Sequence, residues 1–411
     1  MPRNGRGDGR SGRVLLLGAT GRYGRGIVRL LAAAPEVTRL LVAGRDLEAT
    51  RRLVAALGHK ASAVHVDLCR PKELSSAAAD VDLVVNAAGP ERLVVLPALR
   101  QAIDAGADYC DLCADARVVI EARLLQDDAR EADVTALLGA GEFPGLSNLT
   151  MLRAAQALDV AEEVRHCVVY IPANKAELPA ERLQRWRRTG RVDASWQLIM
   201  RSFAPPVSVV RAGRLTAVDP HDEPVTVALP GGTQVTAYPV GFSEPVTLHE
   251  ALPALPVASA LWSFVPSALN ERALELGKVV ARGELRESEA ALDFYERLVS
   301  QPAAPAELRG VSASWVLWAE AIGLKDGHRA TARCAARGGW ATTEGLLCAA
   351  ALRILRGEIT LRGVLSPESC LDPLPYFAEA ARLAGVPTAP AELLEESIWA
   401  LKGRPSAPAP S

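Results

Sequence analysis

The sequence predicts an α/β protein made of a Rossmann doubly wound parallel sheet and a second α+β domain with a mostly antiparallel sheet. Three observations predict this architecture. Short apolar runs alternate with helical patterns over residues 13–145, a glycine-rich loop joins the first run to the first helical pattern, and paired strand-like runs follow over residues 146–340. The length of 411 residues suits two domains.

The first domain is expected to hold six buried strands. Val14–Leu17 is a continuous apolar run, which is typical of a strand covered on both faces of a parallel sheet. Five similar runs follow, at Leu40–Ala43, Ala63–Val66, Val81–Val85, Ala107–Leu112 and Val134–Leu138. Because helical patterns separate them, the strands should be parallel, with a ligand across their carboxyl ends.

A glycine-rich loop follows the first strand and predicts a dinucleotide site. Gly18 permits a tight turn, Gly21 lets the backbone approach a pyrophosphate, and Gly24 lets the helix pack on the strand. The exposed amides at the helix start favour the phosphates. The loop residues predicted to bind the cofactor are Gly18, Ala19, Thr20, Gly21, Arg22, Tyr23 and Gly24.

The end of the second strand indicates which dinucleotide is bound. Arg45 lies about twenty residues past the loop, where an NAD enzyme carries an acid for the ribose hydroxyls. An arginine there pairs with a 2′-phosphate, so NADP(H) is the predicted cofactor. The further residues predicted to bind it are Asp46, Asp67, Leu68, Asn86, Ala87, Ala88, Gly89 and Pro90.

The second domain reads as an antiparallel sheet with helices on one face. Its predicted strands are Val164–Ile171, Val207–Val210, Val225–Leu229, Gln234–Pro239, Val311–Ile322 and Arg329–Ala335, with hairpin signals at Pro230-Gly231-Gly232 and Asp326-Gly327. Its predicted helices are Val257–Gly277, in pieces, and Glu287–Val299. Thr343–Arg356, Pro375–Leu383 and Ala391–Leu401 are also predicted helical. We expect a flexible leader over 1–12 and a disordered tail over 403–411.

Composition narrows the function classes. The net charge of −2 gives no basic surface for nucleic acid, and no window of about 18 apolar residues suggests a membrane span. Seven scattered cysteines without an export signal fit a reducing cytoplasm. Histidines form no ligand-like cluster, and Cys110 and Cys113 lack a second ligand pair, so no metal is expected.

An arginine cluster has two interpretations. Its members are Arg182, Arg185, Arg187, Arg188 and Arg191. Their spacing suits a solvated helix face, and the alternative is an anion pocket for an acidic substrate.

Several segments resemble the saccharopine dehydrogenase family, in its saccharopine-reductase-like branch. They are the loop Gly18–Gly24, Asn86–Pro90, Gly106–Leu112, Pro144–Asn148, Ser243–Leu248 and Gly363–Glu368. The resemblance implies that a Rossmann domain precedes a substrate domain, that helices within 341–402 return to the first domain, and that the protein is a homodimer. Members reduce or form carbon–nitrogen bonds with NADP(H) or NAD(H).

One departure from this family bears on the chemistry. Phe143 stands in the junction turn where the family usually has an aspartate. Glu142 is a candidate substitute as general acid, if burial raises its pKa. Tyr109 and Asp111, at the end of the fifth strand, are the other catalytic candidates, although Tyr109 equally suits a packing role.

We therefore expect a cytoplasmic NADPH-dependent oxidoreductase with a small-molecule substrate. Reduction of a C=N bond is the first hypothesis. A C=C (enoyl) reductase on the same scaffold and a catalytically silent NADP-binding protein are the alternatives, and the absence of a Gly-x-Ser-x-Gly elbow disfavours hydrolysis.

Overall fold

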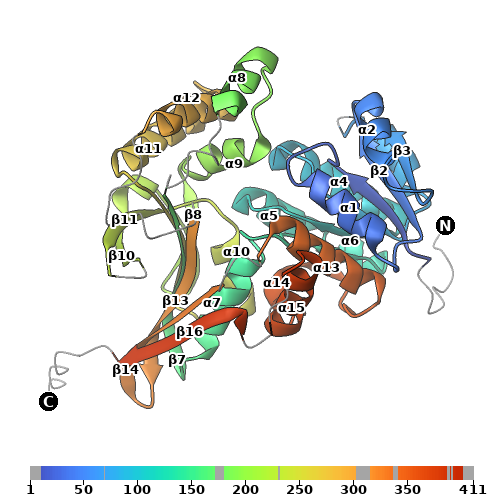
Figure 1. Ribbon diagram of the computed structural model, residues 1–411. Helices are drawn as coiled ribbons and strands as arrows, with labels where there is room; N and C mark the ends of the chain where they lie inside the picture. Colours follow the sequence, from blue (N-terminus) through green and yellow to red (C-terminus); the bar gives the residue numbers. More distant parts are fainter. Residues whose placement is uncertain are drawn as a thin grey trace, which may run out of the picture.

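The computed structural model describes residues 11–68, 70–171, 180–229, 232–301, 315–336, 341–386, 389 and 392–400. Two sheets with their own helices lie side by side, and the C-terminal segment runs against both (Figure 1). The predicted fold class is confirmed.

The first sheet has seven strands in the order β15-β6-β5-β4-β1-β2-β3, all parallel. The strands are β1 (Arg13–Leu17), β2 (Arg39–Gly44), β3 (Ala61–His65), β4 (Leu83–Asn86), β5 (Asp108–Asp111), β6 (Thr135–Leu137) and β15 (Gly363–Leu365). All six predicted strands are present. The seventh, β15, was not predicted because three residues carry too little periodicity, although it extends the sheet beside β6.

Helices cover both faces of this sheet because β1 is apolar on both sides. Val14 and Leu16 pack with α1 and α13, whereas Leu15 and Leu17 pack with α3, α4 and α5. The helices around this sheet are α1 (Gly24–Ala33), α2 (Leu47–Val54), α3 (Pro71–Ala78), α4 (Glu91–Ala105), α5 (Ala116–Ala122), η1 (Arg123–Leu125), α6 (Gln126–Glu131), α13 (Thr343–Leu355), α14 (Pro367–Cys370) and α15 (Pro373–Leu383).

The second sheet has nine strands, and only the pair β7–β12 is parallel among its described ladders. Its strands are β7 (Val160–Tyr170), β8 (Val207–Arg211), β9 (Arg214–Val218), β10 (Val225–Ala228), β11 (Gln234–Pro239), β12 (Val257–Phe264), β13 (Trp315–Lys325), β14 (His328–Ala336) and β16 (Leu394–Ala400). The associated helices are α7 (Leu146–Gln156), α8 (Ala180–Thr189), α9 (Ala194–Ser202), η3 (Pro220–Asp222), α10 (Glu244–Ala251), α11 (Ala268–Ala281) and α12 (Glu287–Val299).

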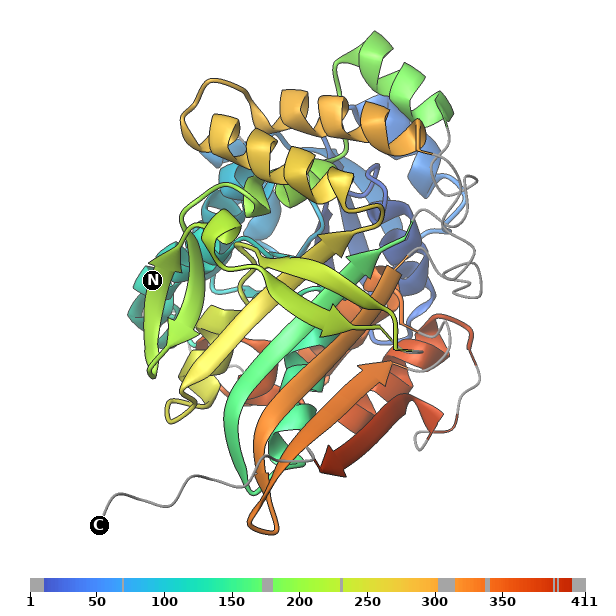
Figure 2. The ribbon, with the colours of Figure 1, turned by 90° about the vertical axis from the view of Figure 1, so that its left-hand side faces the viewer.

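These elements show how the second domain is layered. Figure 2 shows α11 and α12 lying across one end of the sheet, and β10 and β11 crossing in front of it. The two hairpins β10–β11 and β13–β14 are antiparallel, as predicted. Pro230, Gly231 and residues 311–314 lie outside the described residues, as do the predicted tail and residues 1–10 of the leader.

Two predicted helices are strands. Residues 257–264 form β12, which is buried between β7 and β11, and only the part from Ala268 onward is helical. Periodicity alone does not separate a buried strand from a buried helix in such an apolar run. Leu394–Ala400 forms the edge strand β16 on β14, since the backbone of β14 offers hydrogen bonds that the local helical preference does not outweigh.

Candidate functional site

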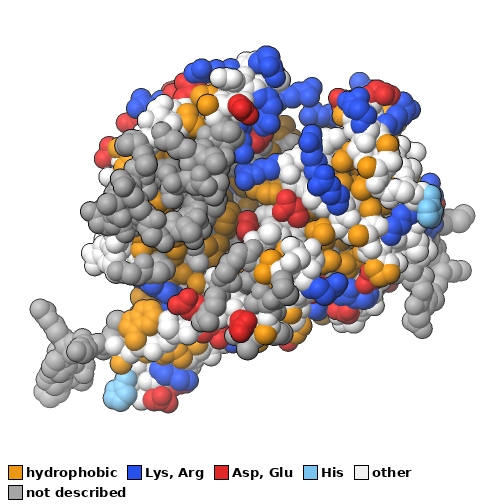
Figure 3. Space-filling model, in the orientation of Figure 1, with side chains coloured by type: hydrophobic (Ala, Val, Ile, Leu, Met, Phe, Trp, Pro, Cys, Tyr) orange, Lys and Arg blue, Asp and Glu red, His pale blue; other side chains and the backbone are white. Residues whose placement is uncertain are grey.

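A cleft of about 590 Å³ lies between the carboxyl end of the first sheet and the second domain. Its walls come from the loops after β1, β2, β3, β4, β5 and β6, from residues 190–199, and from Phe242, Trp262, Ser288 and Thr343. In Figure 3 the molecule is hollowed between the two domains, and Lys and Arg side chains gather over α8 and α2 above the hollow. The site therefore lies where an open α/β sheet binds its ligand.

The glycine loop has the shape that a pyrophosphate requires. Gly18 has a φ of 79°, and a Cβ there would lie 2.5 Å from the backbone nitrogen of Ala88. A Cβ on Gly24 would lie 2.2 Å from the carbonyl oxygen of Gly18. Helix α1 begins at its N-cap Tyr23 without a side-chain hydrogen bond, and the Gly26 amide donates to the Tyr23 carbonyl oxygen, so the amides of Gly24 and Arg25 are the first-turn donors that suit phosphate oxygens. The residues thus fit a bound dinucleotide.

Most of the residues predicted to bind the cofactor line this cleft. They are Gly18, Thr20, Gly21, Arg22, Tyr23, Arg45, Asp67, Leu68, Asn86, Ala87, Ala88, Gly89 and Pro90. Three others have structural contacts instead. Ala19 is buried, Gly24 packs on the loop, and the carboxylate of Asp46 accepts from the Ala49 amide as the N-cap of α2.

Tyr109 lies behind the cleft wall in a buried hydrogen-bond network. Its hydroxyl donates to Asp111 Oδ2 at 2.9 Å and accepts from Asn86 Nδ2 at 2.9 Å. Asp111 Oδ1 accepts from the amides of Cys113 and Gly139, and burial raises the pKa of Asp111 to about 6. The network joins the ends of β4, β5 and β6, so the geometry gives Tyr109 a packing and positioning role, whereas Asp111 also lines the cleft.

Glu142 is the acid that the sequence placed in the junction turn, and it lines the cleft. Its Oε2 accepts a hydrogen bond from Thr343 Oγ1 at 2.9 Å. Burial, with a smaller contribution from Glu344, raises the pKa of Glu142 to about 7, against the opposing charge of Arg22. The side chain is thus partly protonated at neutral pH, as a general acid has to be.

Aromatic side chains from the junction turn and from the second domain line another part of the cleft. Phe143 meets Trp262 edge to face with ring centroids 5.9 Å apart, and it stacks on the buried His166. Phe242 meets Trp262 at 5.6 Å, and Trp196 lines the same cleft from α9. These lining side chains give this part of the cleft an apolar character.

Glu91 is a cleft residue that the sequence interpretation missed. It is the first residue of α4, directly after Pro90, and its Oε2 accepts from the amides of Ala114 and Asp115 at 2.8 and 2.9 Å. An acid immediately after the Asn86–Pro90 segment was the available signal. Because a glutamate is common in the first turn of a helix for electrostatic reasons alone, its position does not by itself indicate a functional residue.

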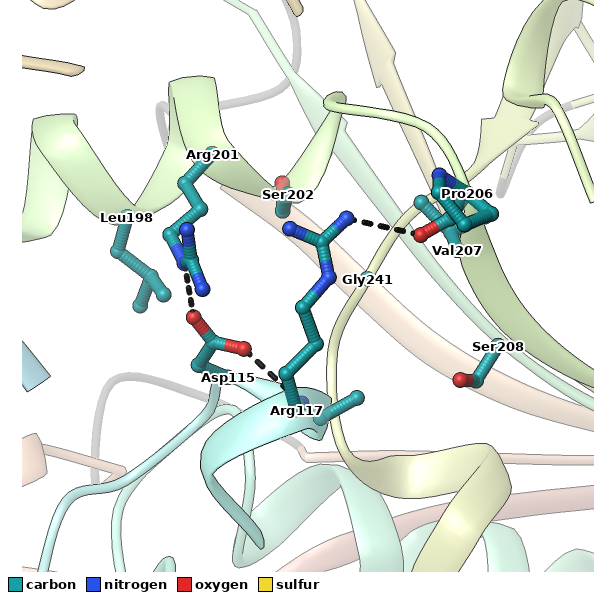
Figure 4. A pocket seen from close by; sticks show the side chains of 10 residues that line it. Asp115, Arg117, Leu198, Arg201, Ser202, Pro206, Val207, Ser208 and Gly241 are labelled. Carbon is teal, nitrogen blue, oxygen red and sulfur yellow. Dashed lines mark hydrogen bonds and ion pairs between the residues drawn. The ribbon is translucent and has the colours of Figure 1, made fainter. Parts of the chain in front are cut away.

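Ion pairs and backbone contacts join the two domains beside the cleft (Figure 4). Arg201 of α9 pairs with Asp115 and, at 3.5 Å, with Glu287. Arg117 donates to the carbonyl oxygens of Ala204 and Pro206 at 2.8 and 2.9 Å. The segment that anchors Glu91 is thereby held from the second domain.

The remaining residues that the sequence singled out form surface ion pairs or are buried, apart from Arg191. Arg182 and Arg185 pair with Asp193, and Arg187 pairs with Glu296, as on a solvated helix face; Arg191 lines the cleft. Cys110 and Cys113 are buried free thiols whose pKa is raised by burial. Within the described residues, no group of His, Cys, Asp and Glu side chains could hold a metal ion, and no helix is long and apolar enough to cross a membrane.

The fold and the site together define a two-domain protein whose first domain has the features of a dinucleotide site. Residues 14–137 match the family model described as the saccharopine dehydrogenase NADP binding domain. This match confirms NADP(H) as the predicted cofactor. Saccharopine dehydrogenase (L-Glu forming) from Saccharomyces cerevisiae shares the fold over 95% of this chain and 100% of its own, with a TM-score of 0.58 and 17% identity.

Curated relatives match over a shorter stretch. The trans-acting enoyl reductase of Mycobacterium leprae is 32% identical over 108 residues, which is 26% of each chain. The trans-acting enoyl reductase of Mycobacterium tuberculosis H37Rv is 32% identical over 102 residues, or 24% of each chain. The match thus spans about a quarter of the length of these relatives. The chain thus carries an NADP-binding domain and shares its overall fold with a saccharopine dehydrogenase.

Proposed function

We propose that this protein uses NADPH to reduce a carbon–carbon double bond conjugated to a carbonyl group in an apolar substrate. The observation that carries this proposal is the aromatic wall of the cleft, with Phe143 at the junction turn. The expected reduction of a C=N bond becomes the second candidate function.

The charges in the cleft favour an apolar substrate over an amino-acid adduct. Beyond the loop arginines Arg22 and Arg45, Arg191 is the one cation among the described residues that line the cleft. A substrate with several carboxylates needs several cations or amide groups to replace its hydration. The partly exposed ring of Phe143 instead offers an apolar surface for a hydrocarbon chain, and the buried rings of Phe242, Trp196 and Trp262 lie behind it.

The curated relatives support the same bond type. Their printed names are trans-acting enoyl reductases, and an enoyl group is a carbon–carbon double bond next to an acyl carbonyl. Their matching stretches are about a hundred residues long, so the names add support to the cleft chemistry without standing in for it.

Bound NADPH supplies a hydride to the β-carbon of such a substrate. Glu142 supplies the proton, since its carboxyl group lines the cleft and its pKa of about 7 keeps it partly protonated at neutral pH. Thr343 orients that carboxyl group through its hydrogen bond to Oε2. The aromatic wall keeps water away while charge develops on the substrate.

Reduction of a C=N bond is supported by a different observation. The chain shares its fold with a saccharopine dehydrogenase, and a protonated Glu142 suits protonation of an imine nitrogen as well as of a carbon. The two candidates differ in the substrate atom that needs stabilisation, a carbonyl oxygen in one and a nitrogen in the other.

The test compares both substrate classes with the same enzyme. NADPH oxidation is followed with an N-acetylcysteamine thioester of octenoic acid and with a cyclic imine such as dihydroisoquinoline, and the products are identified by mass spectrometry. We expect a saturated thioester and little imine turnover. Imine turnover without thioester turnover would overturn the proposal in favour of the second candidate.

Tight NADPH binding without turnover of either substrate would support the silent NADP-binding alternative instead. Replacing Phe143 by Asp provides the matched variant, because it restores the acid usual in the family at this turn. We expect F143D to lose thioester turnover, since it places a charge in the apolar wall.

A further inference from the structure

Glu91 lines the cleft but has no role in the proposed hydride and proton transfers. It follows β4, whereas Glu142 follows β6, and β5 separates these two strands in the sheet. The cleft therefore carries two glutamates on separate strand ends, both lining its wall.

The carboxyl group of Glu91 is held in one orientation. Its Oε2 accepts both the Ala114 and Asp115 amides, which uses that oxygen fully as an acceptor. The second oxygen, Oε1, receives no backbone hydrogen bond from the residues that the structure describes. Since the side chain lines the cleft, Oε1 is the oxygen available to a ligand.

The anchor itself is fixed by the second domain. The Ala116 amide donates to the carbonyl oxygen of Gly241 at 3.1 Å, and Asp115 forms an antiparallel bridge with Phe242. Arg201 pairs with the Asp115 carboxylate on the same segment (Figure 4). These contacts let Oε1 keep its place while a substrate binds.

The surroundings keep Glu91 protonated. Burial is the main cause that raises its pKa to about 8, and the carboxylates of Asp115 and Asp111 raise it further, against the two amide hydrogen bonds. The titratable and charged groups around it are Asp111, Cys113, Asp115, Arg92, Arg201 and Glu287. The two arginines are both paired with Glu287, and Arg201 also with Asp115. At neutral pH the group is therefore a carboxylic acid with an O–H to donate.

We propose that Glu91 is a catalytic residue that donates a hydrogen bond from its neutral carboxyl group to the carbonyl oxygen of the substrate. The inference rests on the proposed function. When the hydride adds to the β-carbon, the electron pair of the C=C bond moves to form an enolate, whose oxygen carries the negative charge. The enolate then takes a proton at its α-carbon from Glu142, and solvent returns a proton to Glu142.

A neutral acid suits this role better than a carboxylate. A carboxylate at Oε1 would repel the developing enolate, whereas an O–H stabilises it, as do other donors aimed at an oxyanion. A carboxylic acid kept neutral by its site is a recognised form of such a donor. The two amides fix Oε2 of Glu91 as the acceptor side, the Cys113 thiol also bonds to this carboxyl group, and Oε1 is left as the donor side.

Two substitutions separate this role from a structural one. E91Q keeps the shape and can present an N–H to the substrate while its oxygen accepts the two amides. E91A removes the donor. Loss of an oxyanion donor lowers kcat by about 100- to 1,000-fold. We therefore expect that loss in E91A, a much smaller loss in E91Q, and an unchanged Kd for NADPH in both. E121A, an exposed glutamate on α5, is the control.

The pH profile gives a second readout. Two carboxyl groups that must both be protonated make log(kcat/KM) fall with a slope of about −2 above the higher pKa. E91Q removes one of them, so the slope becomes about −1. If thermal unfolding shows that E91A folds poorly, the pH slope of E91Q still tests the role of Glu91.

Infrared spectroscopy tests the protonated carboxyl without turnover. The wild-type minus E91Q spectrum should show a protonated carboxyl band at neutral pH that disappears at alkaline pH. No such band, equal rates in wild type and E91A, or an unchanged slope in E91Q would each overturn the assignment. Failure of the proposed function itself is recognised by a different result, because the wild-type enzyme would then not reduce the thioester.

Discussion

Arg45 is an exposed side chain of the cleft that we expect to decide between the two nicotinamide dinucleotides. It follows β2 and lines the cleft. In R45D a repulsive charge replaces a donor to the 2′-phosphate, and charge-assisted hydrogen bonds contribute about 1.5–3 kcal/mol. We expect the Kd for NADPH to rise roughly 10- to 100-fold, and the Kd for NADH to change little, as measured by fluorescence titration.

The control for this change is R52D, on the exposed side of α2 outside the cleft wall. It carries the same change in charge without the contact. An equal loss of NADPH affinity in R52D would mean that net charge, and not contact with Arg45, sets the cofactor preference.

Glu142 supports a prediction about proton transfer. Its pKa is raised to about 7, so its acidic form predominates below neutral pH and is lost as the pH rises through that value. E142Q keeps the hydrogen bond from Thr343 but cannot transfer a proton. We expect kcat to fall by about 100- to 10,000-fold, with the Kd for NADPH unchanged. A wild-type rate in E142Q would remove Glu142 from the reaction.

At the scale of elements, the start of α1 joins fold and cofactor site. A Cβ on Gly24 would meet the backbone of Gly18 and Ala19 within 2.8 Å, and neither can move without shifting β1 or α1. A Cβ on Gly21 would meet only the oxygen of Gly18, at 3.1 Å. Replacement by alanine should therefore disturb the backbone more at Gly24 than at Gly21.

We expect G24A to lower the free energy of unfolding by about 1–3 kcal/mol, as overpacking does. G21A should leave stability within about 1 kcal/mol of wild type but raise the Kd for NADPH roughly tenfold or more, because its methyl group points where the pyrophosphate approaches. Thermal unfolding and NADPH titration on both variants check this. Equal effects of the two changes on both measurements would contradict it.

Elements of the second domain show where local pattern stops being informative. The run Val257–Phe264 is mostly apolar and almost wholly buried, and its pairing with β7 and β11 makes it a strand. Leu394–Ala400 has a helix-compatible sequence but completes the sheet at β14. By contrast, Glu287–Val299 forms a helix with the predicted bounds, because its apolar residues recur at helical spacing on one face.

At the scale of the whole molecule, two domains are held around one cleft by a small set of contacts. Arg201 is central, since its side chain is 22% exposed while that of its partner Asp115 is 4% exposed. In R201M the buried Asp115 loses its cation, and breaking such a pair costs several kcal/mol when fully buried. We expect a loss of about 2 kcal/mol, since Arg201 is partly exposed, seen as a lower Tm in calorimetry.

R187M is the matched control on α8. Its pair with Glu296 has exposed fractions of 57% and 39%, and exposed pairs contribute about 0–1 kcal/mol. A similar fall in Tm for the two variants would show that Arg201 acts as an ordinary surface charge and does not clamp the domains.

The C-terminal segment contacts both domains. Helix α13 covers one face of the first sheet and brings Thr343 to Glu142, β15 extends that sheet, and β16 joins the second sheet. Such long-range returns leave little local signal, because Thr343 and β15 meet partners more than two hundred residues away, and even β16 pairs with a strand 58 to 70 residues before it.

From the sequence alone follow the parallel first sheet, the glycine loop and the arginine that indicates NADP, because strand periodicity, glycine spacing and charge act within about thirty residues. Only the tertiary structure decided that Tyr109 lies behind the wall, that Phe143 joins an aromatic surface, and that Glu91 lines the cleft. Burial and pKa depend on what distant segments bring together. Local pattern therefore indicated the cofactor and the candidate acid Glu142, whereas the other groups proposed to face the substrate depended on the tertiary structure.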